Sequence, residues 1–384
     1  MTKAYPIVAL GDVCQFVGGG TPSRKQPEYF DGDIPWATVK DFKRFRISDT
    51  EEHISEVAVA DSATNIVEAG TVLLVSRVGL GKVAIAERRL AINQDIKGLT
   101  PTPNILSDYL FWFLLSRADD IKRMGAGATV KGITLPDIKS IRMPAPPLDE
   151  QRCIIDLLSR AEGIVRLRRE AQKKAAELIP ALFLEMFGDP ATNPKGWPVA
   201  PIAQLCSVQT GATPARDNPL YYGGSIPWVK TGEVAEEIID KAEETITDLA
   251  IQATNCKVFP ESTILVAMYG QGPTRGRCAM LGIPAATNQA CAAILPSSAI
   301  DHNFLFVLLQ TQYERIRAMG RGVNQANLNL SMIKSFDVMV PPLELQAQFC
   351  NALKQVRSIL SQQAAATQKA EATFNALLAQ VFQN

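Results

Sequence analysis

The stretch of sequence that decides the fold begins Pro146-Pro147-Leu148-Asp149-Glu150-Gln151 and continues to Phe187 with the pattern of one long helix. Apolar and small residues recur in it at alternating spacings of three and four, which is the heptad signature of a helix that packs against another helix. The a and d positions of this heptad are Ile154, Leu157, Ala161, Ile164, Arg168, Ala171, Ala175, Leu178 and Leu182. We therefore predict a helix over 147–187 that buries this seam along one side.

The same stretch occurs a second time, 195 residues later. Its a and d positions are Phe349, Ala352, Val356, Ile359, Gln363, Ala366, Ala370, Thr373 and Leu377. Both copies place a polar residue at one matched position, Arg168 and Gln363, and alanines at the next ones. The helix over 342–384 is therefore the expected partner of the first helix, and a short linker between the repeats makes the pair antiparallel.

The rest of the chain is also duplicated. A shift of 192 aligns the motif Thr-Pro-x-Arg-x-x-Pro-x-Tyr-aromatic-x-Gly-x-Ile-Pro-Trp of 21–36 with 213–228, and the shift becomes 195 after an insertion near Gly272. A period of this length indicates two whole domains and not the units of a solenoid. We expect domains over 1–146 and 199–341, with a linker rich in turn formers over 188–198.

Each domain is predicted to be α+β. Short apolar runs bounded by Gly, Pro and Asp, such as Val72–Val75, Val83–Ala86 and Ile264–Ala267, read as strands. One helix is expected over 110–121 and one over 304–316, each ending before a glycine. Pro180 is expected to kink the first long helix, because it lacks a backbone donor. The fold class is thus two similar α+β domains separated by two long antiparallel coiled-coil helices.

Composition limits the class of protein. The chain has 384 residues, 47% hydrophobic and 20% charged, with 39 basic and 39 acidic side chains. This is the composition of a globular protein, and no apolar run is long enough to span a membrane, so we expect a cytoplasmic protein. The seven cysteines form no C-x-x-C, and two histidines give no metal-ligand spacing, so buried reduced thiols and no metal site are expected.

Motifs for catalysis are missing. The sequence contains neither the Asn/Asp-Pro-Pro-aromatic motif of adenine methyltransferases nor a P-loop. Gly18-Gly19-Gly20 reads as a turn in preference to a phosphate cradle. A buried thiol is favoured over a nucleophile at Cys14 and Cys206, and a surface or capping histidine over a base at His53 and His302. We predict that the chain is not an enzyme.

Polar loops at matching places in both domains suit recognition. Arg, Lys, Asn and Gln are the side chains that pair with base edges in the major groove, although an ordinary solvated loop has the same composition. The candidate residues in the loops over 76–82, 125–131, 269–277 and 320–327 are Arg77, Lys82, Thr129, Lys131, Tyr269, Arg275, Arg277, Arg321, Asn324 and Gln325.

A basic run interleaved with aromatics suits contacts to phosphates. It provides Lys40, Lys43, Arg44 and Arg46, whereas its counterpart, Lys230 to Ile238, is acidic apart from Lys230. Arg24 and Arg216, identical in the two repeats, are open to two interpretations, a phosphate contact or a surface ion pair. For Tyr29 and Trp36 packing is favoured.

These motifs resemble a known family. The G-G-T-P-S-R…Y-F-x-G-D-I-P-W opening, the P-P-L-D-E-Q start of the helix, the F-G-D-P…N-P-K-G-W-P junction and the duplication are similar to the specificity subunit of type I restriction-modification enzymes. The resemblance covers essentially the whole chain. It implies two target-recognition domains that each read one half of a split double-stranded DNA sequence. It also implies that the paired helices separate them and dock two methyltransferase subunits.

The family further implies that this subunit has no activity of its own. Methyltransferase partners would bind S-adenosylmethionine, and restriction subunits would use ATP and Mg²⁺. Candidate partner-binding residues near the two helix starts are Leu148, Glu150, Gln151, Leu343 and Gln346; Leu345 replaces Glu150 in the second copy, so the two surfaces are expected to differ. The alternatives are a self-sufficient DNA-modifying enzyme and a two-headed scaffold that binds no DNA.

Overall fold

The structure is a computed structural model that describes residues 5–125, 132–235, 238–270, 272–320 and 327–382. The chain divides into two compact units. Unit 1 contains the residues up to Glu170 together with those from Ala364 onward, and unit 2 contains Ala171–Gln363. Each unit therefore takes in one globular part and a portion of both long helices. No helix in the described ranges is both long enough and apolar enough to cross a membrane.

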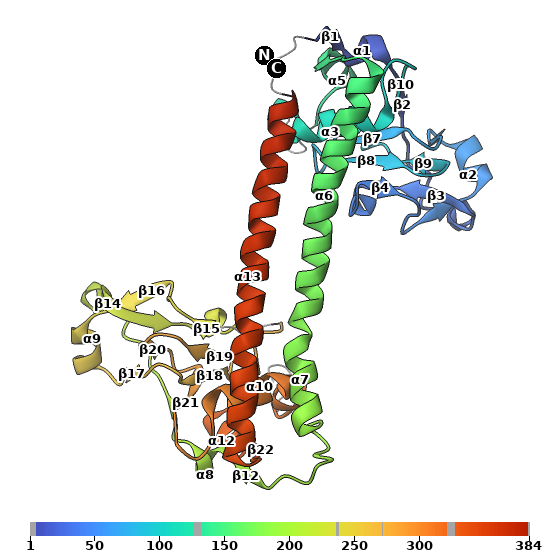
Figure 1. The fold of residues 1–384 in the computed structure, drawn as a ribbon. Helices are drawn as coiled ribbons and strands as arrows, with labels where there is room; N and C mark the ends of the chain where they lie inside the picture. Colours follow the sequence, from blue (N-terminus) through green and yellow to red (C-terminus); the bar gives the residue numbers. More distant parts are fainter. Residues whose placement is uncertain (1–4, 126–131, 236–237, 271, 321–326, 383–384) are drawn as a thin grey trace. The chain divides into compact units, whose positions relative to one another are not determined.

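Two sheets form the globular part of unit 1, and a short strand pair joins its two ends (Figure 1). The five-stranded sheet has the order β2 (Cys14–Gly18), β10 (Ile96–Pro101), β7 (Val72–Val75), β8 (Val83–Ala86), β4 (Arg46–Ile47). The four-stranded sheet has the order β5 (His53–Ile54), β3 (Ile34–Ala37), β9 (Leu90–Ile92), β6 (Asn65–Val67). The strand pair is β1 (Ile7–Ala9) with β11 (Arg142–Pro144).

The central strand β7 shows why this sheet has continuous apolar runs. All four of its residues are buried, because both faces of the sheet are covered. Val72 and Leu74 belong to one hydrophobic cluster, and Leu73 and Val75 belong to another. The predicted strands over Val72–Val75 and Val83–Ala86 appear with these bounds, so the sheet carries a core on each side.

Helices cover one face of the sheet. They are α1 (Leu10–Val13), α3 (Ser107–Ser116), α4 (Ala118–Met124) and α5 (Leu135–Ser140), with α2 (Glu56–Asp61) beside the smaller sheet. The single helix predicted over 110–121 was wrong, because the chain breaks it at Arg117. There the backbone N–H is shared between the carbonyls of Phe113 and Leu114, which tightens the last turn and ends α3.

Unit 2 repeats this topology strand for strand. Its larger sheet has the order β13 (Val208–Thr210), β21 (Cys291–Ile294), β18 (Ile264–Ala267), β19 (Cys278–Leu281), β15 (Ile238–Ile239). Its smaller sheet has the order β16 (Glu244–Ile246), β14 (Tyr222–Val229), β20 (Ala285–Thr287), β17 (Val258–Phe259). The strand pair is β12 (Val199–Pro201) with β22 (Asp337–Met339), and the helices are α8 (Ile202–Leu205), α9 (Asp248–Ala253), α10 (His302–Thr311), α11 (Tyr313–Ala318) and α12 (Leu330–Lys334). The helix predicted over 304–316 is likewise two helices, divided at Gln312.

The first long helix is interrupted and the second is not. The first consists of α6 (Leu148–Ala176) and α7 (Leu178–Phe187), and the second is α13 (Leu343–Phe382). Pro180 explains the difference, since it cannot donate to the carbonyl of Ala176 and its ring clashes with that carbonyl. The matched residue of α13, Asn375, lets the helix continue.

The predicted seam was wrong at every second position. In α6 the buried apolar residues are Leu158 and Val165, whereas Leu157 and Ile164 are 44% and 52% exposed. In α13 Leu353 is buried while Ala352 is half-buried, and Ile359 is 50% exposed. The heptad therefore runs four-three where the sequence suggested three-four. Adjacent apolar pairs such as Leu157-Leu158 satisfy both spacings, so the pattern alone cannot choose between them.

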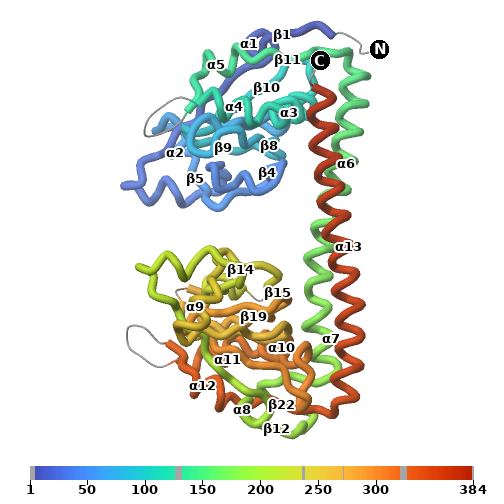
Figure 2. Tube along the Cα trace, turned by 90° about the vertical axis from the view of Figure 1, so that its left-hand side faces the viewer, coloured from blue at the N-terminus to red at the C-terminus, as the bar shows by residue number. Residues whose placement is uncertain are grey.

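Within each unit the helix ends are held in the core. In unit 1, Phe382 of α13 packs against Tyr109 and Phe113 of α3, with ring centroids 5.5 and 5.7 Å apart. In unit 2, Phe187 at the end of α7 occupies the matching position, 4.8 Å from Phe304 of α10. α6 and the last turns of α13 run antiparallel in unit 1 (Figure 2), where Arg169 Nη2 lies 2.6 Å from Glu371 Oε1.

Candidate nucleic-acid interface

The turn between β7 and β8, residues 76–82, is fixed at both ends. Its neck is closed by the backbone hydrogen bond from Val75 N to the carbonyl of Lys82, 3.0 Å long, and Ser76 N donates to the carbonyl of Asp95 at 2.7 Å. Gly81 has φ +83, and a Cβ there would lie 2.5 Å from the carbonyl oxygen of Ala118. Only glycine fits this approach to α4, so the polar turn is a rigid element.

In both units, residues just after the second polar loop are bonded to residues at the start of the first. In unit 1 the backbone N–H of Ile133 donates to the carbonyl of Ser76 at 3.0 Å, and Arg77 forms a bridge with Gly132. In unit 2 the N–H of Leu328 donates to the carbonyl of Met268, also at 3.0 Å. In each unit the residues that directly follow the second polar loop therefore lie beside the start of the turn. The predicted base-reading residues Thr129, Lys131, Arg321, Asn324 and Gln325 lie outside the described residues.

In unit 1 a third segment, 39–46, borders the turn. Lys82 Nζ donates to the carbonyl of Val39 at 3.4 Å. Of the four predicted phosphate-contacting side chains in this segment, Lys40 and Arg44 are exposed. Lys43 is paired with Glu51, whose hydrogen bond raises the pKa of the lysine, and Arg46 is paired with Asp108.

Arg77, in the turn itself, has a more distant acidic neighbour. Its Nε lies 3.9 Å from Asp95 Oδ1, and half of its side chain is exposed. A contact this long to a half-exposed guanidinium is a weak ion pair, so a phosphate or base can replace the carboxylate at little cost.

The matching segment of unit 2 offers a different surface. Lys230 Nζ lies 2.9 Å from both Glu243 Oε2 and Glu244 Oε1. Tyr269 is 42% exposed in the turn between β18 and β19, whereas Arg275 and Arg277 are half-buried. The two units therefore share a site and differ in the side chains that they present there.

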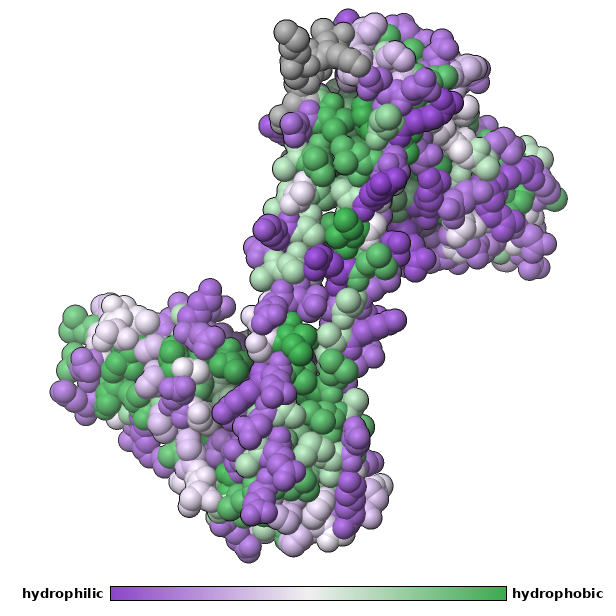
Figure 3. All heavy atoms as spheres, viewed as in Figure 1, coloured by the Kyte–Doolittle hydropathy of each residue, from purple (hydrophilic) through white to green (hydrophobic). Residues whose placement is uncertain are grey.

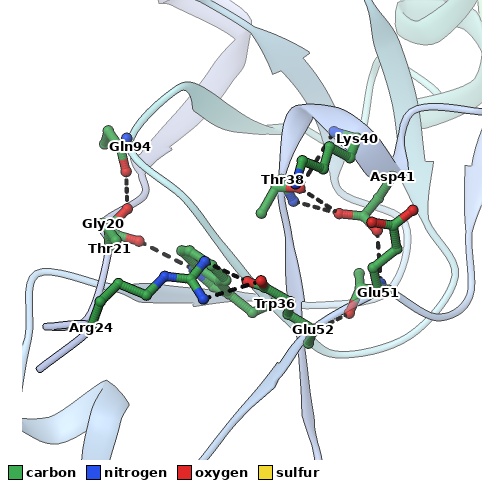
Figure 4. A network of polar contacts seen from close by, with 11 residues as sticks. Gly20, Thr21, Arg24, Trp36, Thr38, Lys40, Asp41, Glu51, Glu52 and Gln94 are labelled. Atoms are coloured by element: carbon green, nitrogen blue, oxygen red, sulfur yellow. Dashed lines mark hydrogen bonds and ion pairs between the residues drawn. The ribbon is translucent and has the colours of Figure 1, made fainter. Parts of the chain in front are cut away.

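Arg24 and Arg216 belong to a frame of repeated contacts around the smaller sheet of each unit, drawn for Arg24 in Figure 4. Arg24 donates two hydrogen bonds to Glu52, of 3.1 and 2.6 Å, and its guanidinium lies 4.4 Å from the Phe30 ring centroid. Arg216 repeats this arrangement with Glu244, at 2.6 Å, and that hydrogen bond raises the pKa of the guanidinium. Of the two interpretations left open by the sequence, the structure shows the ion pair.

Neighbouring contacts of this frame are also repeated. Trp36 Nε1 donates to the carbonyl of Gly20 at 3.2 Å, and Trp228 Nε1 to that of Ala212 at 3.1 Å. Thr21 is hydrogen-bonded to Gln94 (Figure 4), as Thr213 is to Gln289. The residues that are identical in both repeats thus hold the small sheet in place, which is the packing role favoured for Trp36.

Two predicted partner-binding residues are buried, and that prediction was wrong for them. Gln151 Nε2 donates to the carbonyls of Asn104 and Pro146, both at 2.9 Å, and its Oε1 accepts from Leu106 N at 2.8 Å. Gln346 makes the matching contacts with Pro341 and Asp301. Their amides are used inside their own units. Leu343 is 54% exposed, and Leu148 and Glu150 are half-buried.

The thiols of Cys14 and Cys206 are buried, and Cys206 Sγ lies 3.6 Å from His302 Nε2. Burial raises the pKa of Cys14 to about 12 and that of Cys206 to about 11, which keeps both thiols protonated and unreactive. His302 was expected to be a surface or capping histidine; it is the first residue of α10 and is buried, with Nδ1 3.0 Å from the carbonyl of Ser262, and burial lowers its pKa. Cys153 is exposed, contrary to the expectation that the thiols are buried. No group of three or more potential metal ligands occurs in the part of the chain that the structure describes.

Two copies of one α+β fold, each with a polar turn at the same place in its larger sheet and with different side chains in that turn, define a duplicated recognition protein. The family model described as the type I restriction modification DNA specificity domain matches residues 3–177 and again 194–371. The chain belongs to this family and contains its domain twice. The family assignment and the two-domain α+β fold with long helices, both predicted from the sequence, are confirmed. The chain is thus a DNA-specificity protein and not a modification enzyme in its own right.

Relatives and solved structures agree. The MjaIX specificity subunit of Methanocaldococcus jannaschii is 26% identical over 90% of this chain and 85% of its own length. The EcoR124I/EcoR124II specificity subunit of Escherichia coli is 32% identical over 44% of each chain. A chain in a structure of the type I R-M system has a TM-score of 0.67 at 17% identity, covering 98% of this chain and 97% of that one. The S subunit from M. genitalium has a TM-score of 0.57 at 14% identity, with 98% and 96% covered.

Proposed function

We propose that this chain reads a bipartite double-stranded DNA target, with one half-sequence recognised by each unit, and directs methyltransferase and restriction subunits to that target. The observation that carries the proposal is the repeated site. Both units join the two matching strands of the larger sheet, β7 to β8 and β18 to β19, through a polar segment, and the exposed side chains differ, Arg77 in one unit and Tyr269 in the other. Two domains that recognise different DNA sequences need the same supporting contacts and different exposed side chains, and the two units show this combination.

Partner subunits supply the chemistry in this proposal. S-adenosylmethionine is assigned to the methyltransferase subunits, and ATP and Mg²⁺ to the restriction subunits, which act with this chain on DNA in the cytoplasm. Partners also explain the balanced charge of 39 basic and 39 acidic residues. Contacts to phosphates provide most sequence-independent affinity, and partners that make them leave this chain to read bases.

Exposed apolar residues of the long helices are the proposed docking surface for methyltransferase subunits. On α6, Leu157, Ile164 and Leu167 are 44%, 52% and 58% exposed. On α13, Leu343 and Ile359 are 54% and 50% exposed. Hydrophobic residues interrupt the hydrophilic surface along both helices (Figure 3). Apolar side chains at helical spacing outside the buried seam are the usual anchors for a partner helix.

Methylation mapping of the complex tests the function. The chain is expressed with its methyltransferase subunits in a host without other methylation, and the modified motif is read by long-read sequencing. We expect two short sequences around an unspecified gap. Arg77→Ala should relax one half-sequence only, and Tyr269→Ala the other only. A single uninterrupted motif, or variants that change both halves alike, would contradict the assignment of one half to each unit.

A further inference from the structure

Val78, in the turn between β7 and β8, combines an exposed apolar side chain with a strained backbone. It is 58% exposed and has φ +35. A β-branched residue in the left-handed region is a true outlier, because its side chain collides with its own backbone. Strain of this kind persists only where the surrounding structure imposes it, and it is concentrated at functional sites.

The surroundings do impose it. On one side of Val78, Ser76 is bonded to Asp95 and Ile133, and on the other side Leu80 is only 8% exposed within a hydrophobic cluster. Gly79 follows with φ +101, and a Cβ there would lie 3.0 Å from Val39 Cγ1. The turn is therefore anchored on both sides of Val78, and the side chain of Val78 extends from it without being part of the core.

Unit 2 shows that valine is not needed to build this turn. The residue 192 positions later is Gly270, with φ +152, and the other positive-φ residues described in that turn, Gly272 and Gly276, are also glycines. Glycine adopts these angles without strain. Unit 1 has Val78 where unit 2 has Gly270. Because the backbone of the turn does not need a valine, we infer that the valine side chain has a function.

The chemistry around Val78 indicates that use. Arg77 and Lys82 flank it in the turn, and the exposed cations Lys40 and Arg44 lie in the segment that Lys82 contacts. An exposed apolar group on a rigid turn that also carries Arg77 and Lys82 fits the major groove, where thymine offers a C5-methyl group among polar base edges and the backbone is anionic. We propose that Val78 contacts the C5-methyl of a thymine in the half-sequence read by unit 1. The inference rests on the proposed DNA-reading function and adds a specificity-determining residue to it.

Deoxyuridine substitution tests this contact, because it removes the methyl and keeps the base pair. The complex with methyltransferase subunits is titrated with duplexes of the mapped target in which each thymine of the unit 1 half-sequence is replaced singly. We expect one replacement to weaken binding about fourfold, the usual effect of one buried methyl group. Val78→Gly and Val78→Ala should lose this sensitivity, whereas Val57→Ala, at an exposed valine of α2 in the same unit, should keep it.

Thermal unfolding of Val78→Gly separates specificity from folding. Relief of strain predicts a variant at least as stable as the parent, so a loss of discrimination cannot come from misfolding. The proposal is overturned if the half-sequence contains no thymine, if no replacement matters, or if Val78→Gly is as sensitive as the parent. In each of these cases a bipartite motif in which unit 1 still determines one half would leave the proposed function standing. A motif in which unit 1 determines no half would overturn both.

Discussion

Gln151 and Gln346 hold each long helix to the unit in which it begins. Both are fully buried, and each amide both donates and accepts hydrogen bonds with backbone groups near the start of a helix. The sequence shows a glutamine repeated in a polar motif, which suits either an exposed partner contact or an internal clamp. The choice between a partner contact and an internal clamp depends on backbone groups that are distant in the sequence. These groups belong to Asn104–Leu106 for Gln151 and to Asp301 for Gln346.

Removing one of these clamps should destabilise its unit. In Gln151→Ala, Leu106 N and the carbonyls of Asn104 and Pro146 lose their partner, and unsatisfied buried groups typically cost about 1–3 kcal/mol. Urea unfolding measures the loss, with Gln348→Ala, at an exposed glutamine of α13, as the control. Equal stability of the two variants would show that the clamp contributes nothing.

His302 should make the folded state sensitive to mild acid. Burial lowers its pKa in the folded chain, whereas the unfolded value is about 6.5. As the pH falls below 6.5 the unfolded chain binds the proton first, so this contribution to stability is complete above 6.5 and decreases toward the folded pKa.

The measurement is the unfolding free energy at pH 7.5 and pH 5.5. His302→Asn preserves a donor for the carbonyl of Ser262 but does not titrate, so it should lose less stability over this interval than the parent chain. If the parent and the variant show the same pH dependence, the pKa of His302 is not lower in the folded chain than in the unfolded chain.

At the scale of elements, the sequence predicted what depends on local pattern and failed where packing decides. Strands β7, β8 and β18 were predicted with their bounds, because short apolar runs between turn formers have few other uses. The seam of α6 was displaced at alternate positions, because Leu157-Leu158 and Ile164-Val165 offer two apolar choices at each turn. The DNA-reading residues suggested by the repeated polar loops remain a prediction, whereas ion pairs such as Arg24 with Glu52 could not be predicted because they join residues far apart in the sequence.

A neighbouring pair of residues tests the corrected seam. Val165 is 6% exposed and Ile164 is 52% exposed on adjacent positions of α6. Val165→Asp buries an unpaired carboxylate and should cost about 3 kcal/mol or more, whereas Ile164→Asp should change stability by less than about 0.5 kcal/mol.

Thermal unfolding and co-purification distinguish the two faces. If Ile164 belongs to the proposed docking surface, Ile164→Asp should fold normally and retain less methyltransferase subunit. A large loss of stability in Ile164→Asp, with Val165→Asp unaffected, would restore the seam first predicted from the sequence.

At the scale of the whole chain, each unit is completed by the end of a helix that begins in the other. Phe382 of α13 is buried in unit 1, and α13 begins at Leu343 in unit 2; Phe187 of α7 is buried in unit 2, after α6 has begun at Leu148 in unit 1. Truncation of either helix end therefore removes core from the unit that it enters. Neither helix can therefore be shortened without destabilising unit 1 or unit 2.

Lengthening both helices should therefore change the gap of the target and not its half-sequences. One heptad inserted after Glu170 and one after Ala370 preserves the seam, and keeps Arg169 and Glu371 together in unit 1. Seven residues add about 10 Å at 1.5 Å per residue, close to three base pairs of B-DNA. Because added base pairs also rotate the second half-sequence, part of the change must be absorbed by DNA twist, so we expect a gap longer by two or three base pairs.

The methylated motif of the insertion variant decides this prediction. A five-residue insertion at the same points is the matched control, since at about 100° per residue it turns the seam by about 140° and should cost stability and activity. An active heptad variant with an unchanged gap would show that the spacing of the half-sequences is set by the partner subunits or by the DNA, and that α6 and α13 only hold the two units in one chain.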